Sequence, residues 1–155
     1  MGASKQHVPE VATRKDLNGV VQCVHKAYSP YIDALGITPA PLSDDYEELI
    51  RKGFVSIIRD KGKIVGCWVM FVEQDYLLLS NVAVDPVFQG KGIGQRFLEA
   101  AKEHARSLGV DKMCLYTNAA MTQNIDIYKH LGFKEIDRRK EQGYYRVFFE
   151  MKLGK

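Results

Sequence analysis

The spacing of hydrophobic residues along the chain changes repeatedly, which predicts a mixture of strands and helices. Residues 76–84 form an apolar run that ends before Asp85-Pro86, and such a run is typical of a strand with little solvent exposure. Residues 93–108 instead repeat apolar side chains every three or four positions, as one face of a helix does, and Gly109 follows as a helix-ending residue. The predicted helical face consists of Ile93, Phe97, Ala101, Ala105 and Leu108.

The beginning of the chain predicts a short strand followed by a helix. Residues 8–12 can form the strand. Thr13, with Asp16 three residues later, indicates a helix start, because this spacing is an acidic variant of the capping box. The helix is expected to end at Pro30, since proline interrupts helical hydrogen bonding. Its expected apolar face consists of Leu17, Val20, Val21, Val24 and Tyr28.

A loop and a second, shorter helix are expected next. Residues 31–41 contain a glycine and two prolines, which favours a loop. Ser43 can cap a helix over residues 44–51, whose first turn is acidic as the helix dipole prefers. The segment is either an amphipathic connector or one wall of a site for an acceptor substrate. The side chains in question are Tyr31, Ile32, Asp33, Asp44, Asp45 and Tyr46.

The rest of the chain predicts strands joined by short turns, and one more helix. The expected strands are residues 54–59, 63–73, 76–84, 113–117, 134–139 and 144–152. Turns are indicated at Asp60-Lys61-Gly62, Gln74-Asp75 and Gln142-Gly143, and a helix over residues 122–131 is stopped by Gly132. The order β-α-α-β-β-β-α-β-α-β-β indicates an α/β fold with a mixed (α+β) sheet. No repeat or linker interrupts it, so we expect a single domain over residues 1–155.

Composition and charge indicate an ordinary soluble globular protein. Hydrophobic residues make up 46% and charged residues 26% of the 155 residues, and the net charge is only +3 without a long basic run. Nucleic acid is therefore not expected as a partner. No stretch approaches the ~18 apolar residues that span a membrane, and the first residues lack the apolar segment of a signal peptide.

The cysteines and histidines do not indicate a metal site. Three cysteines lie far apart in apolar patterns, which is typical of reduced core thiols in a cytoplasmic protein. They are Cys23, Cys67 and Cys114. The histidines lie on unrelated elements and lack metal-ligand spacing. They are His7, His25, His104 and His130.

Three glycines at alternate positions separate the apolar run from the helix that follows it. A strand that leads through such a turn into a helix presents unpaired N–H groups and the positive end of the helix dipole to an anion. Gly90, Gly92 and Gly94 therefore indicate a phosphate or pyrophosphate cradle, and the alternative is a tight turn that only permits close helix packing. A Walker loop would need Ser or Thr after Lys91, and a dinucleotide fingerprint would need a glycine in place of Gln95.

Two segments carry a resemblance to one family. Gln89, Gly92 and Gly94, after a strand that ends in Val-Ala-Val-Asp-Pro, form Gln-x-x-Gly-x-Gly, which resembles the acyl-CoA-binding motif of the GNAT acyltransferase superfamily. Residues 124–133 resemble its other signature, in which a helix bearing an asparagine and a tyrosine precedes Leu-Gly-Phe and a strand. The resemblance covers about residues 8–152. It implies the GNAT fold with a splayed central strand pair, and an N-acetyltransferase that uses acetyl-CoA as co-substrate.

The resemblance implies binding roles for main-chain groups and a few side chains. N–H groups from Gln89 to Gln95 would hold the pyrophosphate of acetyl-CoA, and main-chain groups around Val82 and Val84 would pair with the pantetheine amides. Lys91 or Lys129 could meet the ribose phosphate. The expected cofactor-binding residues are Val82, Ala83, Val84, Gln89, Gly90, Lys91, Gly92, Ile93, Gly94, Gln95, Asn124 and Tyr128.

Aminolysis of a thioester requires a neutral amine, a donor for the carbonyl oxygen and a proton for the leaving sulfur. A backbone N–H near Val82 is expected to be the donor, and by resemblance Tyr128 is the catalytic residue that donates to the sulfur. Relatives often place a glutamate base on the central strand, but this chain has Ser80 and Asn81 there, and neither is a base near neutral pH. The base is left unassigned between a water wire and four carboxylates: Asp33, Asp44, Asp45 and Glu73.

The leading expectation is therefore an N-acetyltransferase acting on a primary amine. A small-molecule amine is preferred to a protein lysine or N-terminus, because residues 31–51 suggest a closed site with acidic groups. Tyr31, Asp45 and Tyr46 are expected to contact this substrate. The alternatives are a non-catalytic acyl-CoA-binding module and a nucleotide-binding domain. No membrane partner is expected, and a homodimer is possible through the last strand.

Overall fold

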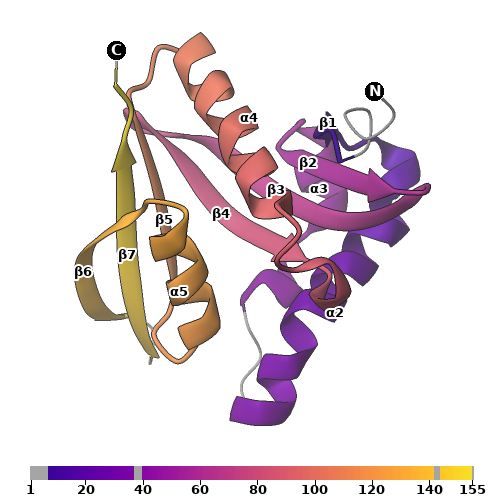
Figure 1. Cartoon of the computed structure of the whole chain (residues 1–155), viewed down its shortest axis with the longest axis horizontal. Helices are drawn as coiled ribbons and strands as arrows, with labels where there is room; N and C mark the ends of the chain where they lie inside the picture. The colour runs from indigo at the N-terminus through magenta and orange to yellow at the C-terminus, as the bar shows by residue number, and fades with distance from the viewer. Residues whose placement is uncertain (1–6, 37–39, 142–143, 155) are drawn as a thin grey trace. The chain divides into compact units, whose positions relative to one another are not determined.

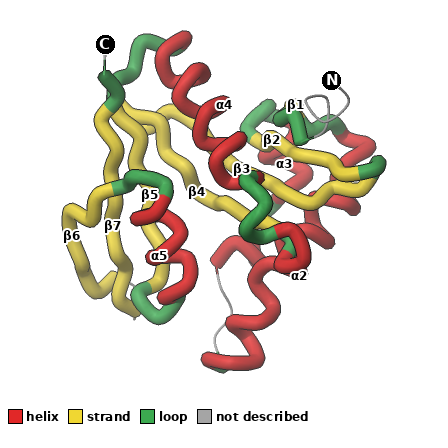
Figure 2. Tube along the Cα trace, viewed as in Figure 1, coloured by secondary structure: helices red, strands yellow, loops and turns green. Residues whose placement is uncertain are grey.

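The structure is a computed structural model that describes residues 7–36, 40–141 and 144–154 (Figure 1). The described chain forms two compact units. The first unit contains the chain up to Met70 together with Asn81–Phe97, and the second contains Phe71–Ser80 and the chain from Leu98 onward. Helices and strands occur in both, so the predicted mixed α/β fold is confirmed (Figure 2). The expectation of a single domain stays a prediction.

The first unit contains three antiparallel strands. They are β1 (Glu10–Val11), β2 (Val55–Asp60) and β3 (Lys63–Glu73), whose last three residues belong to the second unit. Lys61 and Gly62 connect β2 to β3 with positive φ angles of 51° and 84°. Positive φ at both central residues of a turn matches the right-handed twist of the strands in a hairpin. The hairpin turn predicted at Asp60-Lys61-Gly62 is therefore confirmed.

The first helix continues past the proline that was expected to end it. After the short 3₁₀ turn η1 (Arg14–Asp16), helix α2 runs from Leu17 to Leu35 with Pro30 inside it. Proline removes one helical hydrogen bond, but the turns on either side keep theirs. The helix ends at Gly36, which has a φ of 66° and donates its N–H to the Ile32 carbonyl oxygen at 2.9 Å. The loop predicted from residue 31 onward is therefore wrong for residues 31–35.

The second helix begins later than predicted. The 3₁₀ turn η2 (Ala40–Ser43) precedes α3 (Tyr46–Arg51), which packs beside α2. Asp45, and not Ser43, caps α3, because its Oδ1 accepts the N–H of Glu48 at 3.2 Å. Ser43 lies in the preceding 3₁₀ turn, where its hydroxyl does not cap the helix.

The apolar face of α2 is rotated from the predicted one. Val20, Val24 and Tyr28 are buried as expected, but Val21 is 46% exposed and Cys23 is buried in its place. Each helical residue advances about 100° around the axis, so Val21 turns away from the stripe that Val20 and Val24 occupy.

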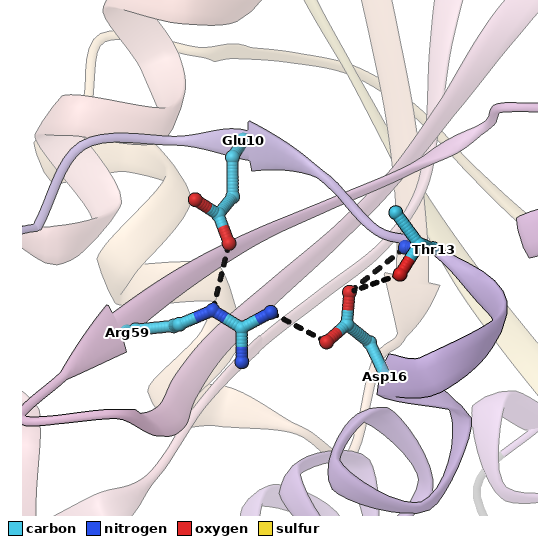
Figure 3. Close-up of polar contacts among 4 residues, drawn as sticks. All are labelled: Glu10, Thr13, Asp16 and Arg59. Carbon is cyan, nitrogen blue, oxygen red and sulfur yellow. Dashed lines mark hydrogen bonds and ion pairs between the residues drawn. The ribbon is translucent and has the colours of Figure 1, made fainter.

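A network of charged groups ties the start of α2 to the strands of the first unit (Figure 3). The buried Asp16 carboxylate accepts the N–H of Thr13 at 2.8 Å and a hydrogen bond from the Arg59 guanidinium, which also donates to Glu10 at 2.7 Å. Burial acts to raise the pKa of Asp16, but the hydrogen bonds from Thr13 and Arg59 outweigh it and hold that pKa below its usual value. The predicted acidic capping pair is thus confirmed.

Asp16→Asn is expected to lower the free energy of unfolding at pH 7 by about 1–3 kcal/mol, because Arg59 would lose its buried charged partner. A carboxyl whose pKa is lowered in the folded state stabilises it above the unfolded pKa of about 3.9, and this contribution is lost as the pH falls through the folded pKa. Urea unfolding at pH 7 and pH 3 would measure it. The stability difference between the two pH values should shrink in Asp16→Asn, whereas the exposed partner variant Glu10→Gln should behave like the wild type.

The second unit contains a mixed set of strands. The start of β4 (Tyr76–Val84) pairs in parallel with β5 (Lys112–Asn118), which pairs antiparallel with β7 (Tyr144–Lys152), and β7 pairs antiparallel with β6 (Lys134–Glu141). Their bounds agree with the predicted strands to within two residues. The turn predicted at Gln142-Gly143 lies outside the described residues.

Two helices follow β4. The 3₁₀ turn η3 (Pro86–Phe88) leads to α4 (Ile93–Ser107), and α5 (Thr122–His130) lies beside β5 and β7 in Figure 1. The predicted face of α4 is buried from Ile93 to Ala105, but Leu108 is 48% exposed because the helix ends before it. In the described part of the chain, no helix combines the length and the hydropathy that crossing a bilayer requires.

Candidate functional site

The end of β4 directs its main-chain groups alternately toward and away from β3. The Asp85 N–H donates to the Val65 carbonyl oxygen on β3 at 2.8 Å. Side-chain burial alternates without interruption along the strand, with Asn81 and Ala83 buried and Val82 and Val84 half-buried. Because hydrogen-bonding directions alternate with side-chain faces in a regular strand, Val82 and Val84 direct their N–H groups away from β3.

The carbonyl groups of these two residues accept hydrogen bonds within the first unit. The Val82 oxygen lies 3.0 Å from the Tyr28 hydroxyl, and the Val84 oxygen lies 3.4 Å from the Gln89 side-chain nitrogen. The N–H groups of Val82 and Val84 are therefore the groups of this strand segment best suited to bind an incoming oxygen. In the second unit, the parallel ladder between β4 and β5 ends at Leu79 and Leu115, as expected of a splayed pair.

The glycine turn between β4 and α4 depends on left-handed backbone geometry. Gly90 and Gly92 have φ angles of 80° and 84°, and a Cβ atom built on either would meet no atom within 4 Å. Close packing therefore does not explain these two glycines, and their φ angles do. The Arg96 N–H donates to the Gly92 carbonyl oxygen at 3.1 Å, so the first turn of α4 begins here. The N–H groups of this first turn have no partner inside the helix and suit an anion.

Two glycines outside this turn permit close packing of helices against β3, and they are Gly19 on α2 and Gly66 on β3 itself. A Cβ atom on Gly19 would come within 2.7 Å of the Ile64 side chain. A Cβ atom on Gly66 would come within 2.8 Å of the Phe97 ring and 3.0 Å of the Ile93 side chain. Phe97 also packs against Trp68, with ring centroids 5.3 Å apart. These contacts seat the first turn of α4 against β3 and so hold the glycine turn in place.

Two charged residues of the first unit, Asp85 and Lys91, lie just before the glycine turn and within it. The Lys91 ammonium lies 5.1 Å from the centre of the Phe88 ring, a cation–π contact. Asp85 is buried, accepts the Val87 N–H at 3.0 Å, and lies 3.8 Å from the ammonium groups of both Lys26 and Lys63. In the second unit, Lys129 forms an ion pair with Glu135 at 3.7 Å.

A chain of hydrogen bonds runs through the core of the first unit. The Tyr46 hydroxyl donates to the Pro41 carbonyl oxygen at 2.6 Å and accepts from the Asn81 side-chain nitrogen at 2.7 Å. The Asn81 side-chain oxygen accepts from the Tyr28 hydroxyl at 2.8 Å. We refer to Tyr28, Asn81 and Tyr46 as the tyrosine–asparagine chain.

The sequence analysis did not predict the tyrosine–asparagine chain. It treated Tyr28 as part of an apolar face and considered Asn81 only as a candidate base. One signal was available, because Asn81 is the polar residue at a position where strand alternation predicts an apolar one.

A pocket of about 550 Å³ lies between α2 and the segment from η2 to α3, and we call it the α2/α3 pocket. Its walls combine apolar groups such as Val21 with the acidic residues Asp44 and Asp45, and Tyr46 also lines it. Burial raises the pKa of Asp44. Of the expected substrate residues, Asp45 and Tyr46 thus share this pocket. Tyr31 lies on α2 with its ring centroid 6.4 Å from that of Tyr28.

The expected leaving-group residues lie together on α5 in the second unit. Tyr128 is buried, and its ring makes edge contacts with Phe149 at 5.9 Å and Phe133 at 6.5 Å between centroids. Asn124 lies one helical turn earlier, and its side-chain nitrogen is 3.8 Å from the Met121 sulfur. Helix packing therefore fixes the orientation of the Tyr128 ring.

Burial disfavours the thiolate form of the cysteines, which is the form that acts as a nucleophile. Cys23 and Cys67 are buried and Cys114 is half-buried, and all three are free. Burial raises the pKa of Cys23 to about 12 and that of Cys67 well above its usual value, so both thiols stay protonated. Across residues 7–36, 40–141 and 144–154, no three His, Cys, Asp or Glu side chains gather as metal ligands would.

The chain matches known acetyltransferases in sequence. The family described as acetyltransferase (GNAT) domain matches residues 51–135. A mycothiol acetyltransferase of Propionibacterium freudenreichii is 34% identical over 85 residues, 52% of this chain and 27% of the relative. A ribosomal protein bS18-alanine N-acetyltransferase of Escherichia coli is 32% identical over 83 residues, 54% of this chain and 56% of the relative. The matched segment thus spans between about a quarter and just over half of these relatives.

Solved structures agree in fold. A PaiA N-acetyltransferase of Thermoplasma acidophilum in complex with coenzyme A has a TM-score of 0.80 at 13% identity, covering 93% of this chain and 97% of that one. The ribosomal-protein-S18-alanine N-acetyltransferase of Escherichia coli has a TM-score of 0.69 at 19% identity, covering 96% and 94%. At these identities the likeness establishes the fold.

Proposed function

Because the chain belongs to the GNAT acetyltransferase family, we propose that it transfers the acetyl group of acetyl-CoA to the primary amine of a small molecule. The observation that carries the proposal is the glycine turn. Gly90 and Gly92 leave open space where side chains would project, and the turn leads into the N-terminus of α4. Such a turn suits a diphosphate, which can approach the main chain closely and accept its N–H groups.

The main chain would supply most of the donor site. N–H groups from Gln89 to Gln95 hold the diphosphate of acetyl-CoA, and those of Val82 and Val84 bind the pantetheine arm and the acyl oxygen. Asn124 on α5 supports the arm. Lys91, whose ammonium lies over Phe88, is the better candidate for the ribose phosphate, because Lys129 is already paired with Glu135.

The reaction forms a C–N bond and breaks the C–S bond of the thioester. The Val82 N–H donates to the carbonyl oxygen as negative charge builds on it. Tyr128 donates a proton to the departing sulfur, so that CoA leaves as a thiol. The bound ammonium group first loses one proton to solvent water, which gives the neutral amine that attacks. The nitrogen loses a second proton to water as the amide forms, and Tyr128 regains its proton from water.

The α2/α3 pocket supports a small cationic acceptor. Its volume of about 550 Å³ falls in the range of small-molecule sites, and its apolar walls carry the carboxylates of Asp44 and Asp45. Asp45 already caps α3, so Asp44 is the residue that draws the ammonium group into the pocket. Tyr46 lines the pocket and bonds to Asn81, which precedes Val82 in the chain.

The test is CoA release from acetyl-CoA with a panel of amines. Small cationic amines should be acetylated, and Asp44→Asn should raise their KM about 10-fold, since a hydrogen bond to a charged group is worth ~1.5 kcal/mol or more. Asp33→Asn is the matched control, because Asp33 lies on α2 outside the pocket lining. An unchanged KM in Asp44→Asn would contradict the assignment of the α2/α3 pocket as the acceptor site. Saturable acetyl-CoA binding without CoA release from any amine would indicate a binding module instead.

A protein N-terminus is the second candidate acceptor. It is favoured by the match to a ribosomal protein bS18-alanine N-acetyltransferase at 32% identity. Peptides that begin with alanine therefore belong in the amine panel. Faster acetylation of these peptides than of any small amine would favour the second candidate.

A further inference from the structure

The tyrosine–asparagine chain places polar groups where packing alone would favour apolar ones. Tyr28, Tyr46 and Asn81 are only 4%, 5% and 3% exposed. Buried polar groups are costly unless they are hydrogen-bonded, and each of these three forms hydrogen bonds of 2.6–3.0 Å. Leu77, Leu79 and Ala83 occupy the other buried positions of β4. A leucine at position 81 would continue the same pattern, so the asparagine requires a reason beyond core packing.

The position of Asn81 suggests that reason. The N–H of Val82 belongs to the peptide group that joins Asn81 to Val82. On one side of this peptide, Tyr28 and Tyr46 hold the Asn81 side chain, and on the other side the Val82 carbonyl oxygen lies 3.0 Å from the same Tyr28 hydroxyl. The Tyr28 hydroxyl therefore contacts groups on both flanks of this peptide, and displacement of the strand at Asn81 or Val82 would break at least one of these hydrogen bonds.

We propose that Asn81 is a positioning residue, which through Tyr28 and Tyr46 holds the Asn81–Val82 peptide so that the Val82 N–H is aimed at the acyl oxygen. This inference rests on the proposed function, in which that N–H stabilises the developing negative charge. A preorganised donor needs no reorientation during the reaction, and this is where most of its advantage arises.

The same chain connects the donor to the α2/α3 pocket. Tyr46 lines that pocket, and its hydroxyl bridges Asn81 to the Pro41 carbonyl oxygen at the start of the η2 segment. Displacement of the Tyr46 ring by a poorly fitting amine would thus disturb Asn81 and the Val82 peptide. The tyrosine–asparagine chain would thus link the position of the Val82 N–H to how the acceptor fits against Tyr46.

Asn81→Leu and Tyr28→Phe test this inference. Each is expected to lower kcat about 10- to 100-fold, since misplacing a reacting group by about 1 Å costs up to about 100-fold. The affinity for CoA, measured by calorimetry, should stay within about 2-fold of wild type, because the glycine turn is unaltered. The double variant should lose little more than the worse single variant, because both act on one peptide group.

Val20→Ala is the matched control for loss of stability. Val20 is fully buried on α2 in the same unit and makes no polar contact. Truncating it therefore loosens the core without altering the tyrosine–asparagine chain. Its melting temperature should fall while kcat is retained. If Asn81→Leu also lowers the melting temperature but retains kcat, Asn81 is structural only and the inference is overturned.

A second readout is independent of activity. In an ¹⁵N–¹H spectrum, Tyr28→Phe should shift the Val82 amide signal and speed its hydrogen exchange, and Val20→Ala should do neither. An unchanged Val82 signal would overturn the inference whatever the kinetics show. If the wild type acetylates no amine but the Val82 signal still responds to Tyr28→Phe, the proposed function fails and the positioning of the peptide stands.

Discussion

Tyr128→Phe is expected to lower kcat about 10²- to 10⁴-fold while leaving the affinity for acetyl-CoA nearly unchanged, because it removes a general acid and little else. The phenylalanine ring preserves the edge contacts with Phe133 and Phe149, so α5 keeps its place on β5 and β7. CoA release at saturating amine measures kcat, and calorimetry with CoA measures the affinity.

The loss of rate should be specific to Tyr128. An exposed tyrosine on β7, Tyr145, provides the control, and Tyr145→Phe should match the wild type in both rate and affinity. Near wild-type turnover in Tyr128→Phe would mean that the sulfur leaves without a proton from this residue.

Gly92→Val is expected to weaken CoA binding about 10- to 100-fold, since a hydrogen bond from the main chain to a charged phosphate is worth ~1.5–3 kcal/mol. Gly92 has a φ of 84°, which a β-branched side chain adopts only under strain. The substitution would therefore shift the turn and misdirect its N–H groups. Calorimetric titration with CoA is the direct measurement.

Gly62→Val is a closely matched control. Gly62 belongs to the same unit, has the same φ of 84°, and likewise has no atom within 4 Å of its would-be Cβ. It lies in the β2–β3 hairpin, away from the turn before α4. Both variants should lose stability by about 1–3 kcal/mol from backbone strain. Equal CoA affinities in the two variants would contradict the role of the glycine turn.

Several parts of the candidate site were predictable from local sequence. The run at residues 76–84 marked β4, because alternating burial and a following Asp-Pro are local signals. The glycine pattern marked the turn, and Ile93 marked the start of α4. The pairing of Asn124 with Tyr128 on one helix also followed from their spacing of four residues.

Other features of the fold and the site could not be predicted from residues that are close along the chain. Pro30 is a strong helix breaker, yet α2 continues to Leu35, because the turns around it keep their own hydrogen bonds. Val21 matched the helical spacing but faces the α2/α3 pocket and not the core. Ser43 was expected to cap the second helix, but Asp45 caps α3. Serine and aspartate are both good capping residues, so the sequence did not decide between them.

The sequence by itself determined the order of strands and helices, the glycine turn and the family, because these depend on the spacing of residues that are close along the chain. Only the tertiary structure decided how Tyr28, Tyr46 and Asn81 meet, since 53 and 35 residues separate Asn81 from its two partners. It also decided that Gly66 on β3 permits close packing, whereas Gly90 and Gly92 do not serve that purpose. The physical reason is that a hydrogen bond or a close contact between distant segments depends on where folding places both partners. The spacing of residues within one segment predicts the structure of that segment and does not predict which other segment packs against it.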